Sequence, residues 1–306
     1  MEEQTKKRIF SNFQKMKTVK SSLGFLGLSR EIKSKNKVLV IPFGLENTVS
    51  YEGGTKMGPK KIISASHQVE LFDEELKKEP YKNFSLKTLK EEKIKKNFNQ
   101  ALEQLTKTVN KTINLKYFPL TLGGEHSITP AIIKSLQQNY SKLTIVQIDA
   151  HADLRDQYLG NKFSHACAMR RCLDFQNIDI IGIGIRNICK AEFEFVKKNT
   201  DRVKIFWSKD ISKKIIQKIK NLIKNKNVYL TFDVDGFDSS LMPATGTPEP
   251  GGLFWSDTLQ ILKIIFKNCN VVGADINELA PKPNLHACDF LTAKLAYKML
   301  SYKFAS

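Results

Sequence analysis

The sequence predicts a single α/β domain in which helices cover both faces of a mainly parallel β-sheet, a three-layer α/β/α arrangement. Three observations favour this class. Apolar stretches of strand length alternate with amphipathic stretches of helical length from residue 117 onward, as in parallel strands joined by right-handed helical crossovers. No linker rich in Pro, Gly or Ser divides the 306 residues. Polar clusters directly follow several strands, where the sites of open α/β sheets gather.

The first third of the chain is less regular. Residues 1–36 are polar and rich in lysine around a short apolar stretch at 25–28, and we expect a surface extension there. The apolar run 37–43 predicts a first parallel strand, because parallel strands are buried on both faces. It is followed by a loop over 44–58, a helix from Ile62, an irregular charged segment over 73–95 and a helix over 97–113.

Strands and helices alternate through the rest of the chain. The predicted strands are the apolar runs 117–122, 143–148, 178–184, 203–206, 227–232 and 270–276. The predicted helices lie over 129–138, 190–198, 210–224, 256–267 and 288–302.

Three metal-ligand residue types follow the strand 143–148 at alternate positions: Asp149, His151 and Asp153. In extended backbone, alternate side chains share a face, so the three can converge on one centre. Two carboxylates and an imidazole are costly to crowd against an apolar strand unless a cation neutralises them. The triplet therefore indicates a metal site, although by itself it is also compatible with the start of a solvated loop.

Two further strands end in polar residues of the same kinds. Asp233 and Asp235 follow the strand 227–232, and Gly123-Gly124-Glu125-His126-Ser127 follows the strand 117–122. Because parallel strands present their carboxyl ends at one edge of a sheet, we expect these side chains to meet those of the triplet. The second and third clusters decide in favour of a metal site.

Composition raises one alternative from another class of protein. A net charge of +18 suggests a nucleic-acid-binding protein. However, the lysines are spread along the chain without an Arg-rich arm or a zinc-finger pattern, so we expect a solvated surface and no nucleic-acid partner. No apolar run approaches membrane-spanning length and no secretory signal is recognised, which predicts a cytoplasmic protein without a membrane partner.

The chain has five cysteines without CxxC spacing, which predicts neither a disulfide framework nor a thiolate zinc site. Cys167 lies two residues after His165 and is a conceivable nucleophile. The strand-end clusters already explain the nearby chemistry, so we expect reduced thiols throughout.

Taken together, these motifs resemble the ureohydrolase family, which includes arginases and agmatinases. They occur in the family's order: Gly-Gly-Glu-His-Ser (123–127), Asp-Ala-His-Ala-Asp (149–153), Ser-His-Ala (164–166), Asp-Val-Asp-Gly-Phe-Asp (233–238), Thr-Gly-Thr-Pro-Glu-Pro-Gly-Gly-Leu (245–253) and Asn-Glu-Leu-Ala-Pro (277–281). Ala152, where threonine is common, and Glu249, at a position that is often apolar, depart from the pattern. The resemblance implies an arginase/deacetylase-like fold, a catalytic domain over 37–306 and a homo-oligomer, trimer or hexamer.

The resemblance also implies two Mn²⁺ ions. One would be held by His126, Asp149, Asp153 and Asp233, and the other by Asp149, His151, Asp233 and Asp235. Four carboxylates roughly balance two divalent charges, and a set without thiolates suits Mn²⁺ better than a structural Zn²⁺. Two such ions can share a water and lower its pKa. A deacetylase-like enzyme with one zinc is the nearest enzymatic alternative, but it lacks the paired Asp-x-His-x-Asp and Asp-x-Asp ends.

Two catalytic residues follow from the resemblance. Glu278 matches the glutamate that pairs with the substrate guanidinium, a planar group suited to two-point carboxylate recognition. His165 matches a histidine that carries protons, a role for a group titrating near neutrality. The alternatives are a solvated loop acid and a packed or surface histidine. His67 and His286 match no ligand position, and we expect structural or surface roles for both.

The substrate is expected to be agmatine, cleaved to putrescine and urea. In arginases the metal motif continues with an asparagine that helps hold the α-carboxylate, and Arg155 stands at that position here. Gly-Gly-Glu-His and the stretch 50–59 also resemble the agmatinase branch. Arg155 can instead bind a substrate carboxylate, which would favour an arginase, guanidinobutyrase or formimidoylglutamase activity. A third possibility is that Arg155 has no role in substrate binding and forms a salt bridge with Asp156 or another nearby acid.

Overall fold

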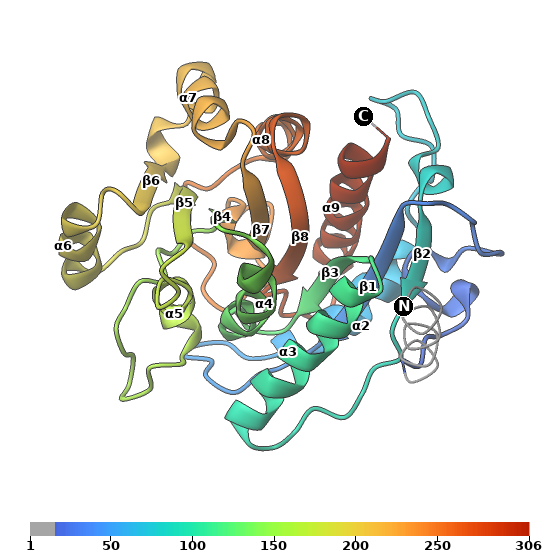
Figure 1. The fold of residues 1–306 in the computed structure, drawn as a ribbon, viewed down its shortest axis with the longest axis horizontal. Coiled ribbons are helices and arrows are strands. Elements are labelled where there is room, and N and C mark those ends of the chain that lie inside the picture. Colours follow the sequence, from blue (N-terminus) through green and yellow to red (C-terminus); the bar gives the residue numbers. More distant parts are fainter. Residues whose placement is uncertain (1–15, 306) are drawn as a thin grey trace, which may run out of the picture.

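Eight parallel strands form one sheet in the order β2-β1-β3-β8-β7-β4-β5-β6 (Figure 1). The computed structural model describes residues 16–305. The strands are β1 (Lys37–Phe43), β2 (Ser85–Thr88), β3 (Phe118–Gly123), β4 (Leu143–Ile148), β5 (Ile178–Ile185), β6 (Val203–Trp207), β7 (Asn227–Asp233) and β8 (Asn270–Asn277). The predicted α/β class is confirmed.

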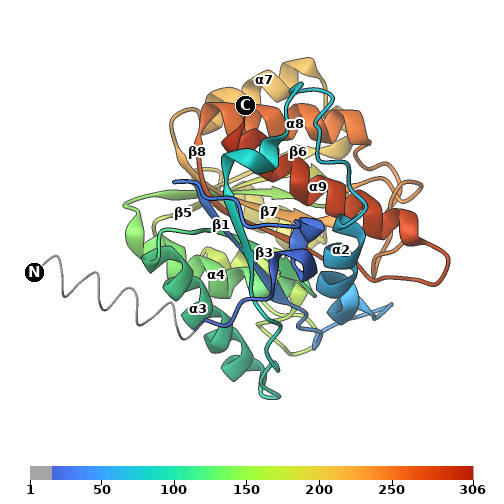
Figure 2. The same ribbon diagram turned by 90° about the vertical axis from the view of Figure 1, so that its right-hand side faces the viewer.

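Helices cover both faces of the sheet. They are α2 (Gly58–Ser66), α3 (Phe98–Asn114), α4 (Thr129–Leu136), α5 (Ala168–Cys172), α6 (Lys190–Lys198), α7 (Lys213–Ile223), α8 (Trp255–Asn268) and α9 (His286–Phe304). Figure 2 shows α2, α8 and α9 on one side of the sheet and α3 and α4 on the other.

The sheet separates two hydrophobic cores because successive strand residues point to opposite faces. In β1, Val38 and Val40 are buried in the core beneath α2, α8 and α9, whereas Leu39 and Ile41 are buried in the core beneath α3 and α4. All six residues of β4 are buried, as expected for a strand covered on both faces. A continuous apolar run therefore identified this strand.

Most predicted elements agree with the structure within a few residues, and 37–43, 143–148 and 190–198 agree at both ends. Asn97 accepts a hydrogen bond from the backbone of Gln100 and begins α3. Ser212 caps α7 in the same way, so this helix starts at Lys213 and not at the predicted residue 210. Such caps satisfy backbone N–H groups of the first turn that have no partner within the helix.

Two expectations for the first third of the chain are wrong. The apolar stretch 25–28 is not on the surface, since Phe25, Leu26 and Leu28 are buried in the core beneath α2 and α9. The remainder of the predicted extension, residues 1–15, lies outside the described residues. The segment expected to be irregular contains strand β2, in which only alternate residues are buried. Its four residues are too few for a recognisable pattern.

In the described part of the chain, no helix combines the length and the apolar character needed to cross a membrane.

Candidate metal centre

Four neighbouring strands, β3, β8, β7 and β4, bring the predicted ligands to one edge of the sheet. His126 follows β3, the triplet of residues 149, 151 and 153 follows β4, and Asp233 ends β7. Glu278 directly follows β8. The clusters that are far apart in the sequence therefore meet at the centre of the sheet, where the carboxyl ends of parallel strands place them.

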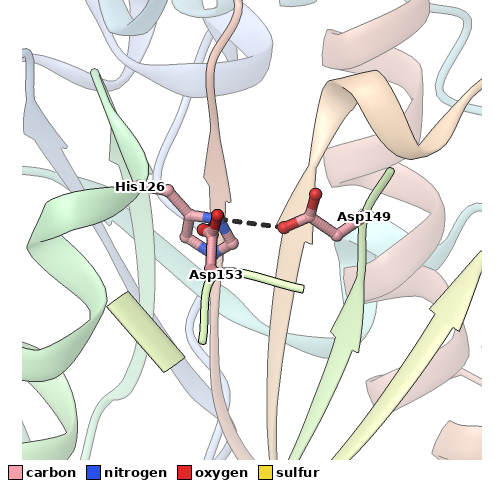
Figure 3. A group of neighbouring side chains, drawn as sticks. All are labelled: His126, Asp149 and Asp153. Carbon is pink, nitrogen blue, oxygen red and sulfur yellow. Dashed lines mark ion pairs between the residues drawn. The ribbon is translucent and has the colours of Figure 1, made fainter. Parts of the chain in front are cut away.

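The first ligand group surrounds His126, whose side chain is 1% exposed. Its Nδ1 lies 3.1 Å from Asp149 Oδ2 and 3.1 Å from Asp153 Oδ2, and 3.4 Å from Asp233 Oδ2. Figure 3 shows the imidazole with the carboxylates of Asp149 and Asp153. Nδ1 has no hydrogen-bond partner among the described residues. A buried nitrogen without a partner and three nearby carboxylates form a donor set that fits a cation.

Hydrogen bonds behind His126 aim this nitrogen toward the carboxylates. The other ring nitrogen, Nε2, lies 2.7 Å from Thr231 Oγ1, and the Thr231 hydroxyl donates its proton to Asp275. Thr231 therefore accepts from His126 Nε2–H, which leaves the lone pair on Nδ1 for a metal ion. Asp275 is buried within β8 and also accepts from the Tyr229 hydroxyl at 2.8 Å. Neither Thr231 nor Asp275 was predicted from the sequence, although an acid inside an apolar strand was a usable signal for Asp275.

The second ligand group contains Asp149, His151 and Asp235. His151 Nδ1 lies 2.9 Å from Asp235 Oδ2 and 3.8 Å from Asp149 Oδ1. Backbone amides orient these carboxylates, because Asp149 Oδ1 accepts from His151 N at 2.6 Å and Asp235 Oδ1 accepts from Ala150 N at 3.0 Å. Asp149 belongs to both groups. Its two oxygens thus face two centres, as a bridging carboxylate requires.

The acids of this centre repel one another. Burial, reinforced by the charges of Asp235 and Asp153, raises the pKa of Asp149 to about 7. Burial and the charges of Asp235 and Asp149 likewise raise the pKa of Asp233 well above its usual value. Burial alone would lower the pKa of His151, but the charge and hydrogen bond of Asp235 raise it to about 11. A cation bound between these groups would relieve the repulsion and displace the protons.

One cavity of about 200 Å³ opens onto the centre, and the predicted residues line it, with the exception of Asp149. Glu278 has a left-handed backbone with φ 67°, and its Oε1 accepts a hydrogen bond from His126 N at 2.6 Å. Burial and the charge of Glu125 raise the pKa of the Glu278 carboxyl well above its usual value. A guanidinium group bound there would stabilise the ionised form of this carboxylate.

The other two predicted residues lie on the walls of the cavity. His165 begins a short 3₁₀ turn before α5, and its Nδ1 lies 3.1 Å from Thr48 Oγ1. The Arg155 guanidinium stacks 5.0 Å from the centre of the Tyr158 ring, and its Nε lies 3.9 Å from Glu192 Oε2. Asp156, which was weighed as its partner, instead accepts a hydrogen bond from Arg171.

The structure also shows where the two residues that depart from the family pattern and the alternative nucleophile lie. Ala152 is buried in the core beneath α3 and α4 and also borders the cavity. Glu249 Oε1 lies 3.9 Å from His151 Nε2, the ring nitrogen that is not the one near Asp235. Cys167 is buried, and burial raises the pKa of its thiol to about 11. A thiol with this pKa is protonated near neutrality, which argues against the nucleophile alternative.

Comparisons with known proteins agree with this geometry. The family model described as "Arginase family" matches residues 36–301. An N(1)-aminopropylagmatine ureohydrolase of Synechocystis is 36% identical over 275 residues, which cover 87% of this chain and 88% of that protein. An agmatinase of Bacillus cereus is 33% identical over 255 residues, covering 81% and 84%. The crystal structure of the agmatine ureohydrolase of Thermoplasma volcanium superposes with a TM-score of 0.78 at 31% identity, covering 88% and 90%.

Proposed function

The chain belongs to the arginase family and is a ureohydrolase, and we propose that it is a two-manganese enzyme that hydrolyses agmatine to putrescine and urea. The observation that carries the proposal is Asp149, which is shared by two groups of potential ligands that each contain one histidine. All donors are carboxylate oxygens and imidazole nitrogens, a set that fits Mn²⁺. The proposed ligands are His126, Asp149, His151, Asp153, Asp233 and Asp235.

When bound, the metal pair supplies a water that is ionised near neutrality. The chain's own residues supply the remaining functions. Glu278 lies at the cavity wall and is proposed to bind the guanidinium through two parallel hydrogen bonds, fixing the carbon that is attacked. His165 lines the same cavity and is proposed to protonate the departing amine.

Agmatine is favoured because the positive group on the cavity wall is already engaged. Arg155 faces Tyr158 and Glu192, so it is a poor receptor for a substrate carboxylate. An amine substrate needs no such receptor. N(1)-aminopropylagmatine is the second candidate, because a relative with 36% identity carries that name.

The test is urea release measured with agmatine, N(1)-aminopropylagmatine, arginine and 4-guanidinobutyrate, and formamide release with formiminoglutamate. We expect the highest kcat/KM with agmatine. A higher value for any carboxylate-bearing substrate would refute the choice of an amine. Metal analysis of the protein purified with Mn²⁺ should give two ions per chain, and a single zinc ion would contradict the two-metal site.

We further propose a homo-oligomer, a trimer or hexamer, that acts in the cytoplasm without a nucleic-acid or membrane partner. Light scattering at micromolar concentration tests the assembly, and a monomer would contradict it. Binding to duplex DNA or RNA that weakens with salt would contradict the proposed absence of a nucleic-acid partner.

A further inference from the structure

Thr48 connects the loop after β1 to two residues that are distant in the sequence. Its hydroxyl oxygen lies 3.1 Å from Glu125 Oε1 and 3.1 Å from His165 Nδ1. The same oxygen accepts a hydrogen bond from the backbone N–H of His165 at 3.0 Å. Three contacts therefore converge on one hydroxyl group, which has one proton to donate and two lone pairs to accept.

Glu125 is an acceptor in this arrangement. It is fully buried, and its Oε2 accepts from the backbone N–H groups of Asn47 at 2.8 Å and Thr48 at 2.6 Å. Its Oε1 accepts from the hydroxyl of Ser127. A carboxylate surrounded by donors draws the Thr48 proton toward itself.

The direction of the third contact follows from counting protons. The Thr48 hydroxyl donates to Glu125, and the backbone N–H of His165 can only donate. The contact with His165 Nδ1 must then be a hydrogen bond from Nδ1–H to the second lone pair of Thr48. Ser164 Oγ, at 3.5 Å, is more distant from Nδ1. The Tyr158 ring lies nearly perpendicular to the imidazole, with the ring centres 6.2 Å apart.

We propose that Thr48 is a positioning residue that fixes the tautomer of His165, keeping the proton on Nδ1 and leaving the lone pair of Nε2 free on the side of the cavity. The inference rests on the proposed role of His165 in proton transfer. A histidine that takes up and delivers protons at one nitrogen needs the other nitrogen held in a defined state. Thr48 provides this without touching the substrate.

The decisive measurement is the tautomer itself. We would record ¹H–¹⁵N spectra of the full chain with ¹⁵N-labelled histidine rings, loaded with Mg²⁺ because Mn²⁺ broadens the signals. His165→Asn would assign the resonance. For the neutral ring we expect the Nδ1–H form in the unaltered protein. An Nε2–H form would overturn the proposal, whether or not the Thr48 variants fold.

Two variants add a kinetic test. Thr48→Val keeps the shape of the side chain and removes the hydroxyl, whereas Thr48→Ser keeps the hydroxyl. We expect Thr48→Val to mix the tautomers and lower kcat about tenfold at unchanged KM, the effect of one lost hydrogen bond. Thr48→Ser should restore both readouts to within about twofold. A Thr48→Val protein with the original tautomer and kcat would overturn the proposal.

The two proposals fail in different ways. The tautomer is observed without substrate, so a protein that releases urea from no guanidino compound would refute the proposed function and leave the tautomer result in place. A correct function with the opposite tautomer would refute only the role of Thr48.

Discussion

The molecule buries two clusters of charged side chains, and they differ in what neutralises them. In the cluster at α9, Lys298 Nζ lies 2.9 Å from Asp73 Oδ2, 3.4 Å from Glu74 and 3.5 Å from Glu75. At the metal centre, by contrast, no lysine or arginine within residues 16–305 forms an ion pair with the aspartates that follow β4 and β7. One cluster is paired with a lysine, whereas the described partners of the other are histidines, which must give up their protons to bind a metal ion.

The pKa shifts reflect this difference. Burial alone would lower the pKa of Lys298, but the hydrogen bond and charge of Asp73 raise it above its usual value, so the ammonium stays charged. Burial and neighbouring acids raise the pKa of Asp149 to about 7, so its charged form is disfavoured. Buried charge that is internally paired indicates a structural role, whereas buried acids with raised pKa values indicate a site for an external cation.

The largest effect is expected from Asp149→Asn, which tests whether the acid cluster needs a metal. The change removes the carboxylate shared by both ligand groups, so both ions should be lost and kcat/KM should fall by at least about 10³-fold. Metal analysis and urea release would measure this. The metal-free variant should unfold no more easily than metal-free wild type, because repulsion is relieved. Asp156→Asn, at an exposed acid, is the control and should keep both ions.

Lys298→Met is the opposite test, on the cluster that contains its own cation. Asp73 would be left buried without its partner, which should lower the free energy of unfolding by about 3 to 5 kcal/mol, while Mn²⁺ stoichiometry stays the same. Urea denaturation would measure the change. Lys107→Met, which breaks an exposed pair with Glu103, should cost no more than about 1 kcal/mol. Loss of manganese on Lys298→Met would show that the two clusters are coupled.

His165→Ala should separate catalysis from metal binding. We expect kcat to fall about 10²-fold, the contribution of a general acid or base, with two ions still bound. Stopped assays of urea release and metal analysis of the same sample would measure both. His286→Ala, at an exposed histidine at the start of α9, is the matched control. Manganese lost from the His165 variant would place His165 among the ligands, against its proposed role.

The strand-end ligands were predictable because each lies next to a recognisable strand. Asp149 and Asp233 follow apolar runs, and the topology of a parallel sheet brings such positions together. Thr231 was not predicted, although it lies inside one of those runs, because only its contact with His126 shows its role. Thr48 was missed for the same reason, since its partner His165 is 117 positions away. Local sequence patterns predict which side chains lie at the end of a strand, whereas tertiary contacts determine which residues form hydrogen bonds with them.

The errors in the fold have a similar origin. The stretch containing Phe25 lies in a polar, lysine-rich context, so its burial depends on a surface supplied by distant helices. Helix α5 was not predicted because its five residues, Ala168–Cys172, are too short for helical periodicity. Long elements with several turns or buried residues were recognised because their own pattern is sufficient.

Lowering the pH should weaken metal binding at the metal centre and leave the stability contributed by the Lys298 cluster unchanged. Below its pKa of about 7, the Asp149 carboxyl carries a proton that Mn²⁺ must displace. The affinity for Mn²⁺ should therefore fall by more than about tenfold from pH 8 to pH 6, and it should still rise above pH 8, because the raised pKa of His151, about 11, leaves a further proton to displace. Calorimetric titration at these pH values would measure it. The Lys298 cluster should contribute equal stability at both, because the raised pKa of a lysine makes that contribution disappear only at much higher pH.

The smallest effect is expected from Arg155→Ala. This variant tests whether Arg155 is paired within the protein, as Lys298 is, or is free to bind an anionic group of the substrate. Its guanidinium lies near Glu192 and over Tyr158, so kcat/KM for agmatine should change by less than about threefold. Lys162→Ala, at an exposed cation outside the cavity lining, is the control. A selective loss of about tenfold with 4-guanidinobutyrate would show that Arg155 leaves Glu192 to bind a carboxylate, since discrimination measures the differential binding of two transition states. If 4-guanidinobutyrate also had a higher kcat/KM than agmatine, the proposal that agmatine is the substrate would be refuted.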